Sequence, residues 1–296
     1  MKWSVYNQSL VRRGELLIGF DVIDNWDSEL KEMNKDKVGE PFQYPNTFLL
    51  LLGYAKVFFH LAYRQTEGIA KGHAKGKVPS IPNYTTISRR INRLNIKVED
   101  ATITDNESTK YNYIIIAIDS TGIKVTNRGQ WIRDKWNIRK GYLKIHIAVD
   151  VKSKKIISMK VTDEHVHDSK MLPKIVDAIA KSKHMTVDKI QTDGAYDSNA
   201  VFRCLIDNEI LPCVKVRRNA RVKKTNNTFR NLSVILQKKD LQRWKDSVSY
   251  GKRWVAETVF SCIKRTFGEY VYSIKFKNMV KEMLLKASLY NKLLSF

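Results

Sequence analysis

Cysteine is scarce in this chain of 296 residues, and its three cysteines follow no recognised pattern. Cys204, Cys213 and Cys262 lack the CxxC or Cys/His spacing of a metal site, and an odd number cannot form a complete disulfide framework. This argues against a small secreted scaffold held by disulfides. We expect a reduced, intracellular protein of the cytoplasm, associated with the nucleoid if its partner is DNA.

Long hydrophobic runs are also missing. The most apolar stretch, residues 48–54, is far shorter than the ~20 residues that a membrane-spanning helix needs. The first residues, MKWSVYNQSLVRRGELL, contain no apolar segment of the kind found in a signal peptide. We therefore expect neither secretion nor insertion into a membrane.

Acidic residues are few relative to basic ones. The chain has 53 Lys and Arg against 30 Asp and Glu, which gives a formal net charge of +23 and a pI near 9.8. A strongly basic surface binds nucleic acid largely independently of base sequence, because its cations displace the counterions bound to the nucleic-acid phosphates. The charge balance therefore favours nucleic acid as the partner, with solubility or an anionic membrane as the alternative explanation.

The N-terminal third has helical patterns and a basic segment near its end. Residues 85–94 begin with capping-type residues and predict a helix that presents Ser88, Arg89, Arg90 and Arg93. This pattern suits a recognition helix that contacts DNA, although a solvated basic helix has the same composition. We interpret residues 1–96 as a helical DNA-binding region and the polar residues 97–111 as a linker.

The remaining chain, residues 112–296, alternates strand and helix patterns and predicts a mixed α/β domain. Three successive strand segments suggest a meander, and later strands alternate with helices. We predict strands at 113–118, 142–149, 155–161, 187–192 and 211–216, and helices at 170–180, 199–208, 248–270 and 278–294. The basic, Asn-rich residues 217–239 are expected to form an exposed loop.

Two aspartates follow predicted strands directly. Asp119 comes after the apolar run 113–118, and Asp193 comes after the strand at 187–192 and before a glycine. In open α/β sheets, ligands and catalytic groups gather at the carboxyl ends of strands. We therefore expect the two carboxylates to lie close together.

A third carboxylate belongs to a predicted helix. At about 100° per residue, Tyr250, Arg253, Glu257 and Lys264 project within an arc of ~60°. The apolar positions of the same helix, Val255, Val259, Phe260, Ile263 and Phe267, fall on the opposite side. The helix is therefore predicted to present one carboxylate that is flanked by an aromatic hydroxyl and two cations.

Three carboxylates suit metal-dependent phosphoryl transfer on DNA. Two divalent ions, Mg²⁺ or Mn²⁺, activate the attacking hydroxyl and stabilise the leaving oxygen when carboxylates hold them about 4 Å apart. Asp119, Asp193 and Glu257 are the predicted catalytic and metal-binding residues. Arg253, Lys264 and Tyr250 are predicted to contact DNA phosphates, the arginine in bidentate fashion and the lysine as a point charge.

The spacing Tyr-x2-Arg-x3-Glu-x6-Lys at residues 250–264 resembles the signature of DDE transposases from bacterial and archaeal insertion sequences. Residues 117–122 and 192–197 are similar to the first and second aspartate motifs of that group, and the segments 63–68 and 84–90 resemble its DNA-binding part. The resemblance implies an RNase H-like catalytic core flanked by helices. It also implies an enzyme that cuts double-stranded DNA at terminal inverted repeats and joins the 3′ ends to a target. Because two ends must be cut in concert, we expect a homodimer on DNA.

Two other functions share the same residues. An RNase H-like nuclease would hydrolyse DNA without joining it, and a catalytically inactive DNA-binding regulator would keep only the basic surface. The intact carboxylate trio argues against the regulator.

Several further residues near the motifs have ordinary structural explanations. His165 and His167 are spaced like metal ligands on a strand, but we interpret Asp168 and Asp197 as helix caps. Trp131 and Trp136 are interpreted equally well as core residues or as base-stacking groups.

Overall fold

The computed structural model describes residues 3–18, 24–98, 113–125, 142–181 and 186–296. The chain forms two compact units, one of residues 1–97 with 273–296 and the other of residues 98–272. Trp131, Trp136 and most of the predicted linker lie outside the described residues.

The second unit is built on a mixed six-stranded sheet with the order β3-β2-β1-β4-β5, and β6 also pairs with β1. Strand β2 pairs antiparallel with both β1 and β3. Strands β4 and β6 pair in parallel with β1, and β5 pairs in parallel with β4. The strands are β1 (Tyr113–Val125), β2 (Tyr142–Asp150), β3 (Ile156–Asp163), β4 (Thr186–Thr192), β5 (Leu211–Val214) and β6 (Tyr270–Val271). The predicted meander and the mixed α/β architecture are therefore confirmed.

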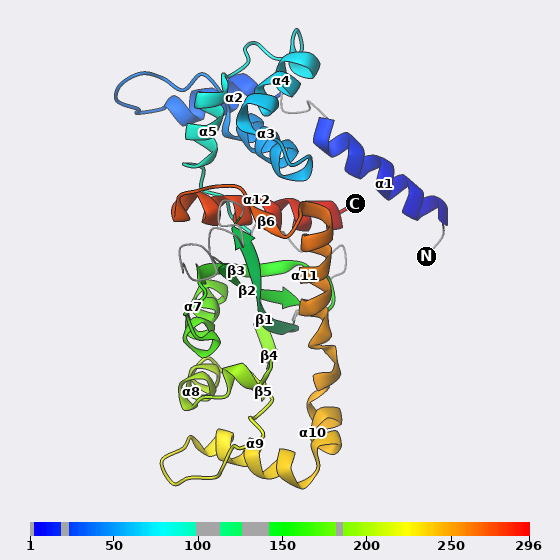
Figure 1. The fold of residues 1–296 in the computed structure, drawn as a ribbon, viewed down its shortest axis with the longest axis vertical. Helices are drawn as coiled ribbons and strands as arrows, with labels where there is room; N and C mark the ends of the chain where they lie inside the picture. The colour runs from blue at the N-terminus through cyan, green and yellow to red at the C-terminus, as the bar shows by residue number, and fades with distance from the viewer. Residues whose placement is uncertain (1–2, 19–23, 99–112, 126–141, 182–185) are drawn as a thin grey trace, which may run out of the picture. The chain divides into compact units, whose positions relative to one another are not determined.

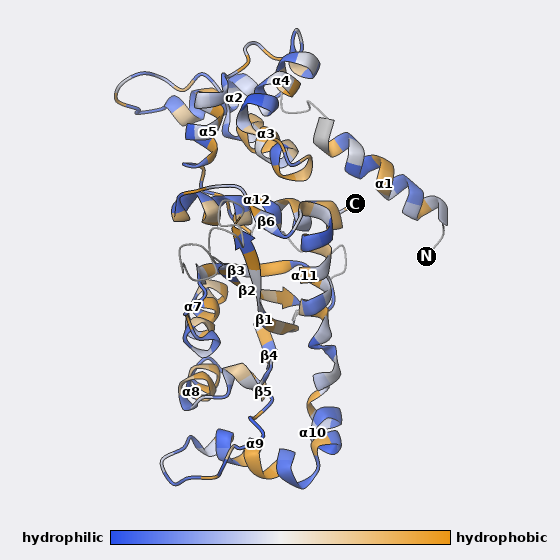
Figure 2. Ribbon diagram, in the orientation of Figure 1, coloured by the Kyte–Doolittle hydropathy of each residue, from blue (hydrophilic) through white to orange (hydrophobic). Residues whose placement is uncertain are grey.

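Helices cover both faces of this sheet. Helices α7 (Asp168–Ala180) and α8 (Asn199–Asp207) lie on one side, and α11 (Trp254–Phe267) lies on the other (Figure 1). Hydrophobic residues concentrate on the strands and on the helix surfaces that face them (Figure 2). This arrangement explains the apolar run 113–118, since a strand covered on both sides buries both sets of side chains, although Tyr113 at its start is 64% exposed.

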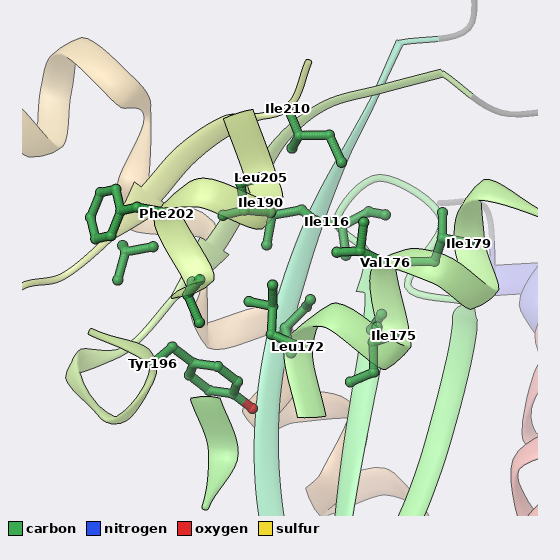
Figure 3. Packing of buried hydrophobic residues seen from close by; sticks show 14 of the residues in the cluster. Ile116, Leu172, Ile175, Val176, Ile179, Ile190, Tyr196, Phe202, Leu205 and Ile210 are labelled. Atoms are coloured by element: carbon green, nitrogen blue, oxygen red, sulfur yellow. The ribbon is translucent and has the colours of Figure 1, made fainter. Parts of the chain in front are cut away.

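The core between the sheet and α7 and α8 consists mainly of aliphatic side chains. Ile116 of β1 is completely buried, and Leu172 of α7 and Phe202 of α8 pack in the same cluster (Figure 3). On the opposite face, the five apolar residues predicted to form the buried side of α11 are each less than 9% exposed, which confirms the helical pattern. Burial of each such side chain contributes about 1.5–3 kcal/mol, so this packing holds α7, α8 and α11 against the sheet.

The segment predicted as an exposed basic loop is partly helical. Residues 228–239 form α9 (Thr228–Lys239), and α10 (Leu241–Val248) follows. Val234 is 1% exposed and belongs to the core cluster, while the side chain of Asn227 caps the helix by accepting from Phe229 and Arg230. The basic composition hid this helix because few of its side chains are buried: Ser233, Val234 and Gln237 face inward, and Phe229, Leu232, Ile235 and Leu236 are exposed.

The first unit is helical, as predicted. It contains α1 (Trp3–Ile18), α2 (Trp26–Asn34), α3 (Asn46–Phe58), α4 (Tyr63–Ala74), α5 (Tyr84–Ile91) and α12 (Phe276–Leu294). Helix α12, which we expected in the catalytic domain, packs against α3 instead. A Cβ atom at Gly53 would lie 3.0 Å from Cδ2 of Leu285, so glycine permits this close approach.

Helix α5 corresponds to the predicted basic helix. It begins after Asn83, whose side chain accepts a 2.8 Å hydrogen bond from the backbone N–H of Thr86. Ile87 and Ile91 are buried on its inner side.

Among the described residues, no helix is both long enough and apolar enough to cross a membrane.

Candidate active site

Asp119 lies within β1 rather than at its end. The strand continues to Val125, because Ser120, Thr121 and Gly122 all pair with β2. The prediction that the strand stops before Asp119 was therefore wrong: the Ser-Thr-Gly run resembles a turn, but pairing with a neighbouring strand overrides that preference. Asp119 accepts a 2.8 Å hydrogen bond from the backbone N–H of Ser120.

Asp193 follows β4 directly, as predicted. Its Oδ1 atom accepts a 2.9 Å hydrogen bond from the N–H of Ala195 and caps the short 3₁₀ helix η2 (Gly194–Tyr196). Because β4 runs parallel to β1 and pairs with it up to Ala117 and Gln191, both aspartates emerge at the same end of that strand pair. The topology thus places them as neighbours.

Arg253 connects the first aspartate to the helical glutamate. Its Nη1 atom lies 3.1 Å from Oδ2 of Asp119, and Nη2 contacts Oε1 of Glu257, one helical turn away. The guanidinium therefore bridges carboxylates from β1 and α11. The predicted neighbourhood of Arg253 and Glu257 on one helical face is present, with Asp119 opposite it.

The electrostatics of Asp119 reflect the other two carboxylates. Burial raises the pKa of Asp119 above its usual value, while the N–H of Ser120 and the charge of Arg253 lower it. The negative charges of Asp193 and Glu257 raise the same pKa further. The three carboxylates therefore interact electrostatically in one site, although they come from positions far apart in the chain.

Tyr250 does not share the exposed helical face that we predicted. It lies in the 3₁₀ helix η3 (Tyr250–Lys252), before α11 begins, and its side chain is only 7% exposed. Its hydroxyl donates a 2.8 Å hydrogen bond to the carbonyl oxygen of Thr192, and its ring packs on Trp244 with centroids 5.1 Å apart. The helical arithmetic failed because the chain is not continuous α-helix across residues 250–264.

Lys264 lies on α11 with its ammonium directed to the sheet. Its Nζ atom donates a 2.9 Å hydrogen bond to Oγ1 of Thr121, two residues beyond Asp119 on the same face of β1. A cation is thus held beside the carboxylate site by a neutral partner. A lysine ammonium is a compact point charge with three donors, so it can also contact a phosphate.

Carboxylate oxygens are the ligands that Mg²⁺ and Mn²⁺ prefer, so the chemistry of the donor set fits these ions. Within the described residues, however, no three His, Cys, Asp or Glu side chains are grouped closely enough to form a ready metal site. The positive charge that contacts Asp119 and Glu257 in this arrangement is the guanidinium of Arg253.

An ion cluster on the other face of the sheet was missed by the sequence reasoning. Asp168, expected to cap α7, is its first residue; its Oδ1 atom lies 2.9 Å from Nζ of Lys144 and 3.3 Å from Nδ1 of the buried His146. Burial opposes ionisation, but contacts with His146, Lys144 and Ser120 hold the pKa of Asp168 well below its usual range. The alternating positions 144 and 146 on one strand were the available signal.

The predicted cations of α5 have different surroundings. Arg90 donates to the carbonyl oxygen of Tyr44 and to Oδ1 of Asn46, and its guanidinium stacks on Phe42 at 4.3 Å. Arg89, in contrast, is exposed in a cavity of about 670 Å³. That cavity is also lined by Arg64, Arg93, Lys277, Tyr63 and Tyr84.

The second unit is thus a mixed sheet flanked by helices, and two aspartates of its strands and a glutamate of a covering helix have cations beside them, an arrangement that suits phosphoryl transfer. The chain belongs to the transposase DDE domain family. A model of that family matches residues 110–292, and a second model with the same description matches residues 11–128.

Solved structures with a similar arrangement include transposase complexes. The Drosophila P element transposase in its strand transfer complex is 12% identical, with a TM-score of 0.35, over 63% of this chain and 44% of that chain. The piggyBac transposase in a synaptic complex with hairpin DNA is 9% identical, with a TM-score of 0.43, over 96% of this chain and 74% of that chain. An intasome of simian T-cell lymphotropic virus gives 14% identity and a TM-score of 0.27, over 69% and 65% of the two chains. The family assignment rests on the two sequence models.

Proposed function

We propose that this protein is a transposase that binds the terminal inverted repeats of its element, cleaves double-stranded DNA there and joins the 3′-OH ends to target DNA. The observation that carries the proposal is the bridge of Arg253 between Asp119 and Glu257, with Asp193 near enough for its charge to raise the pKa of Asp119. Ordinary surface carboxylates have no reason to converge from β1, β4 and α11.

Asp119, Asp193 and Glu257 are proposed to hold two divalent metal ions, Mg²⁺ or Mn²⁺. When bound, these ions supply an activated hydroxyl and stabilise the leaving oxygen of the phosphodiester. Arg253 then exchanges its carboxylate partners for a DNA phosphate, and Lys264 provides a second phosphate contact from its place beside Thr121. Tyr250 is assigned a positioning role, because its hydroxyl is bound to the backbone next to Asp193.

The helical unit is proposed to bind the element ends. The cavity beside α5 combines Arg64, Arg89, Arg93 and Lys277, and none of the described residues that line it is acidic. The ring of Tyr84 stacks on the guanidinium of Arg64 at 4.7 Å, so an aromatic surface lies among the cations. Phosphate binding by such a surface would orient the DNA, and cleavage of two ends in concert would require a homodimer on the DNA.

The test is a reaction of the purified protein with labelled inverted-repeat DNA and Mg²⁺ or Mn²⁺. Strand-transfer products should form with the wild type and disappear with Glu257→Gln, which keeps the side-chain size but removes the charge. The matched control is Glu269→Gln, an exposed glutamate whose carboxylate pairs with Lys124 and should leave the products unchanged. Binding without cleavage in all three proteins would refute the proposal, and cleavage without joining would favour the nuclease.

A further inference from the structure

A second basic cavity lies in the catalytic unit, beside the loop that follows Asp193. Its volume is about 580 Å³, and its lining includes Arg217, Arg221, Lys223, Arg230, Asn199 and Asn226. The composition of residues 217–239 predicts only an exposed loop. The cavity instead shows that this segment gathers cations around a defined space.

The rear of the cavity is a fixed ion pair. Asp197, whose side chain is fully buried, accepts 2.7 and 3.0 Å hydrogen bonds from Nε and Nη2 of Arg230, and a 3.0 Å bond from the backbone N–H of Arg217. Ser198, and not Asp197 as predicted, caps α8. Asp197 is the single carboxylate among the described residues of the lining, and it is engaged by Arg230.

Arg217 ties the cavity to the catalytic loop. Its Nε atom donates a 3.1 Å hydrogen bond to the carbonyl oxygen of Gly194, the residue after Asp193. The segment that carries Arg221 and Lys223 is thereby anchored beside the backbone of the second catalytic aspartate. A strand of DNA that occupies this cavity would therefore lie beside the loop that follows Asp193.

Asparagine side chains hold the outer part of the cavity in place. Nδ2 of Asn226 donates to the carbonyl oxygen of Arg221 at 3.1 Å, and Nδ2 of Asn231 donates to that of Lys223 at 2.8 Å. The backbone is therefore ordered while both basic side chains are exposed. Within the part of the chain that the structure describes, no carboxylate pairs with Arg221 or Lys223.

We propose that this cavity binds backbone phosphates of the DNA strand that runs through the active site, with Arg221 and Lys223 making the contacts. The inference rests on the proposed function, because the nucleic acid is the expected substrate. Exposed cations around a defined space favour a phosphodiester chain, because it presents one negative charge after another.

The experiment compares the full-length wild type with Arg221→Gln/Lys223→Gln. The matched control is Lys238→Gln/Lys239→Gln, which removes the same charge from exposed positions at the end of α9, outside the cavity. Anisotropy of a labelled inverted-repeat duplex in EDTA gives the affinity over a series of KCl concentrations. The cavity variant should bind about tenfold more weakly, and its slope of log affinity against log salt should decrease by up to about 1.8, or about 0.9 for each phosphate that is no longer bound.

The control variant should retain the wild-type slope. Equal losses in both double variants would mean that net charge alone matters and would overturn the proposal, as would unchanged binding by the cavity variant. Release of the DNA by inorganic phosphate at constant ionic strength would mark a pocket for a small anion, and this also overturns it. Because binding is measured without metal, a protein that fails to cleave DNA but shows the selective loss would refute the proposed function and leave this inference standing.

Discussion

The hydroxyl of Tyr250 donates a 2.8 Å hydrogen bond to the carbonyl oxygen of Thr192, the residue immediately before Asp193. The preceding residue of each segment forms a second hydrogen bond, in which Nε2 of Gln191 donates to the carbonyl oxygen of Ser249 at 2.8 Å. Together these bonds attach the end of β4 to the segment that leads into α11. They fix the distance between the strand that carries Asp193 and the helix that carries Glu257.

Tyr250→Phe should therefore weaken the site without removing any group that touches DNA. The backbone N–H of Lys215 still donates to Thr192, so the expected loss of stability is modest, about 1 kcal/mol. The metal concentration that gives half-maximal cleavage should rise several-fold, because the carboxylates are held less firmly. Titration with Mn²⁺ measures this, with Tyr6→Phe as the control at an exposed tyrosine. An unchanged titration would mean that the bond has no part in positioning.

Arg253→Gln should have opposite effects on metal binding and on catalysis. Loss of the guanidinium frees oxygens of Asp119 and Glu257, so the metal should bind more tightly. The cleavage rate at saturating metal should fall by about 10²-fold, because a cation that stabilises the transition-state charge is gone. Cleavage rates across a metal titration separate the two effects. Lys252→Gln, at an exposed cation next to Arg253, should change neither, and weaker metal binding in Arg253→Gln would contradict the bridge.

Asp168→Asn should destabilise the protein in a way that depends on pH. The folded-state pKa of Asp168 is depressed, so its ion pairs stabilise the fold above the unfolded pKa of about 3.9, and this contribution disappears as the pH falls through the folded value. The wild type should be more stable than the variant by about 2 kcal/mol near neutrality, with the difference shrinking in acid. Urea unfolding at several pH values measures it. Asp207→Asn, an exposed change on α8, should show no such trend.

Lys286 provides a prediction at alkaline pH. It is 1% exposed, and burial lowers its pKa to about 8; the charge of Glu282 opposes that shift, while Lys56 adds to it. The unfolded chain keeps the proton up to about pH 10.4, so this residue makes the folded state more stable as the pH rises from about 8 to 10. The wild type should gain stability over that interval relative to Lys286→Met.

Chemical denaturation of both proteins at the two pH values tests this prediction. Glu282 keeps hydrogen bonds from the N–H and Oγ of Ser273, so the methionine variant is expected to fold. Lys292→Met, near the end of the same helix, is the control. A constant stability difference between wild type and Lys286→Met would contradict the lowered pKa.

The sequence by itself determined the architecture of the catalytic unit. The apolar run 113–118, the alternation of later strands and helices, and the buried side of α11 are local patterns, and burial in the folded chain agrees with each of them. The charge excess pointed to nucleic acid for the same reason, because composition requires no knowledge of contacts. Asp119 and Asp193 were predicted from their positions after strands, and Glu257 was predicted from the helical pattern and spacing of residues 250–264.

Only the tertiary structure decided how individual side chains are used. Tyr250 and Arg90 are residue types that often contact DNA, but both form hydrogen bonds within the protein. Asp168 and Asp197 look like helix caps in the sequence, yet both are ion-pair partners of cations that arrive from other elements. Hydrogen bonds and ion pairs of this kind depend on which distant segments meet. Periodicity within one segment carries no information about such partners, and so the pairing had to come from the fold.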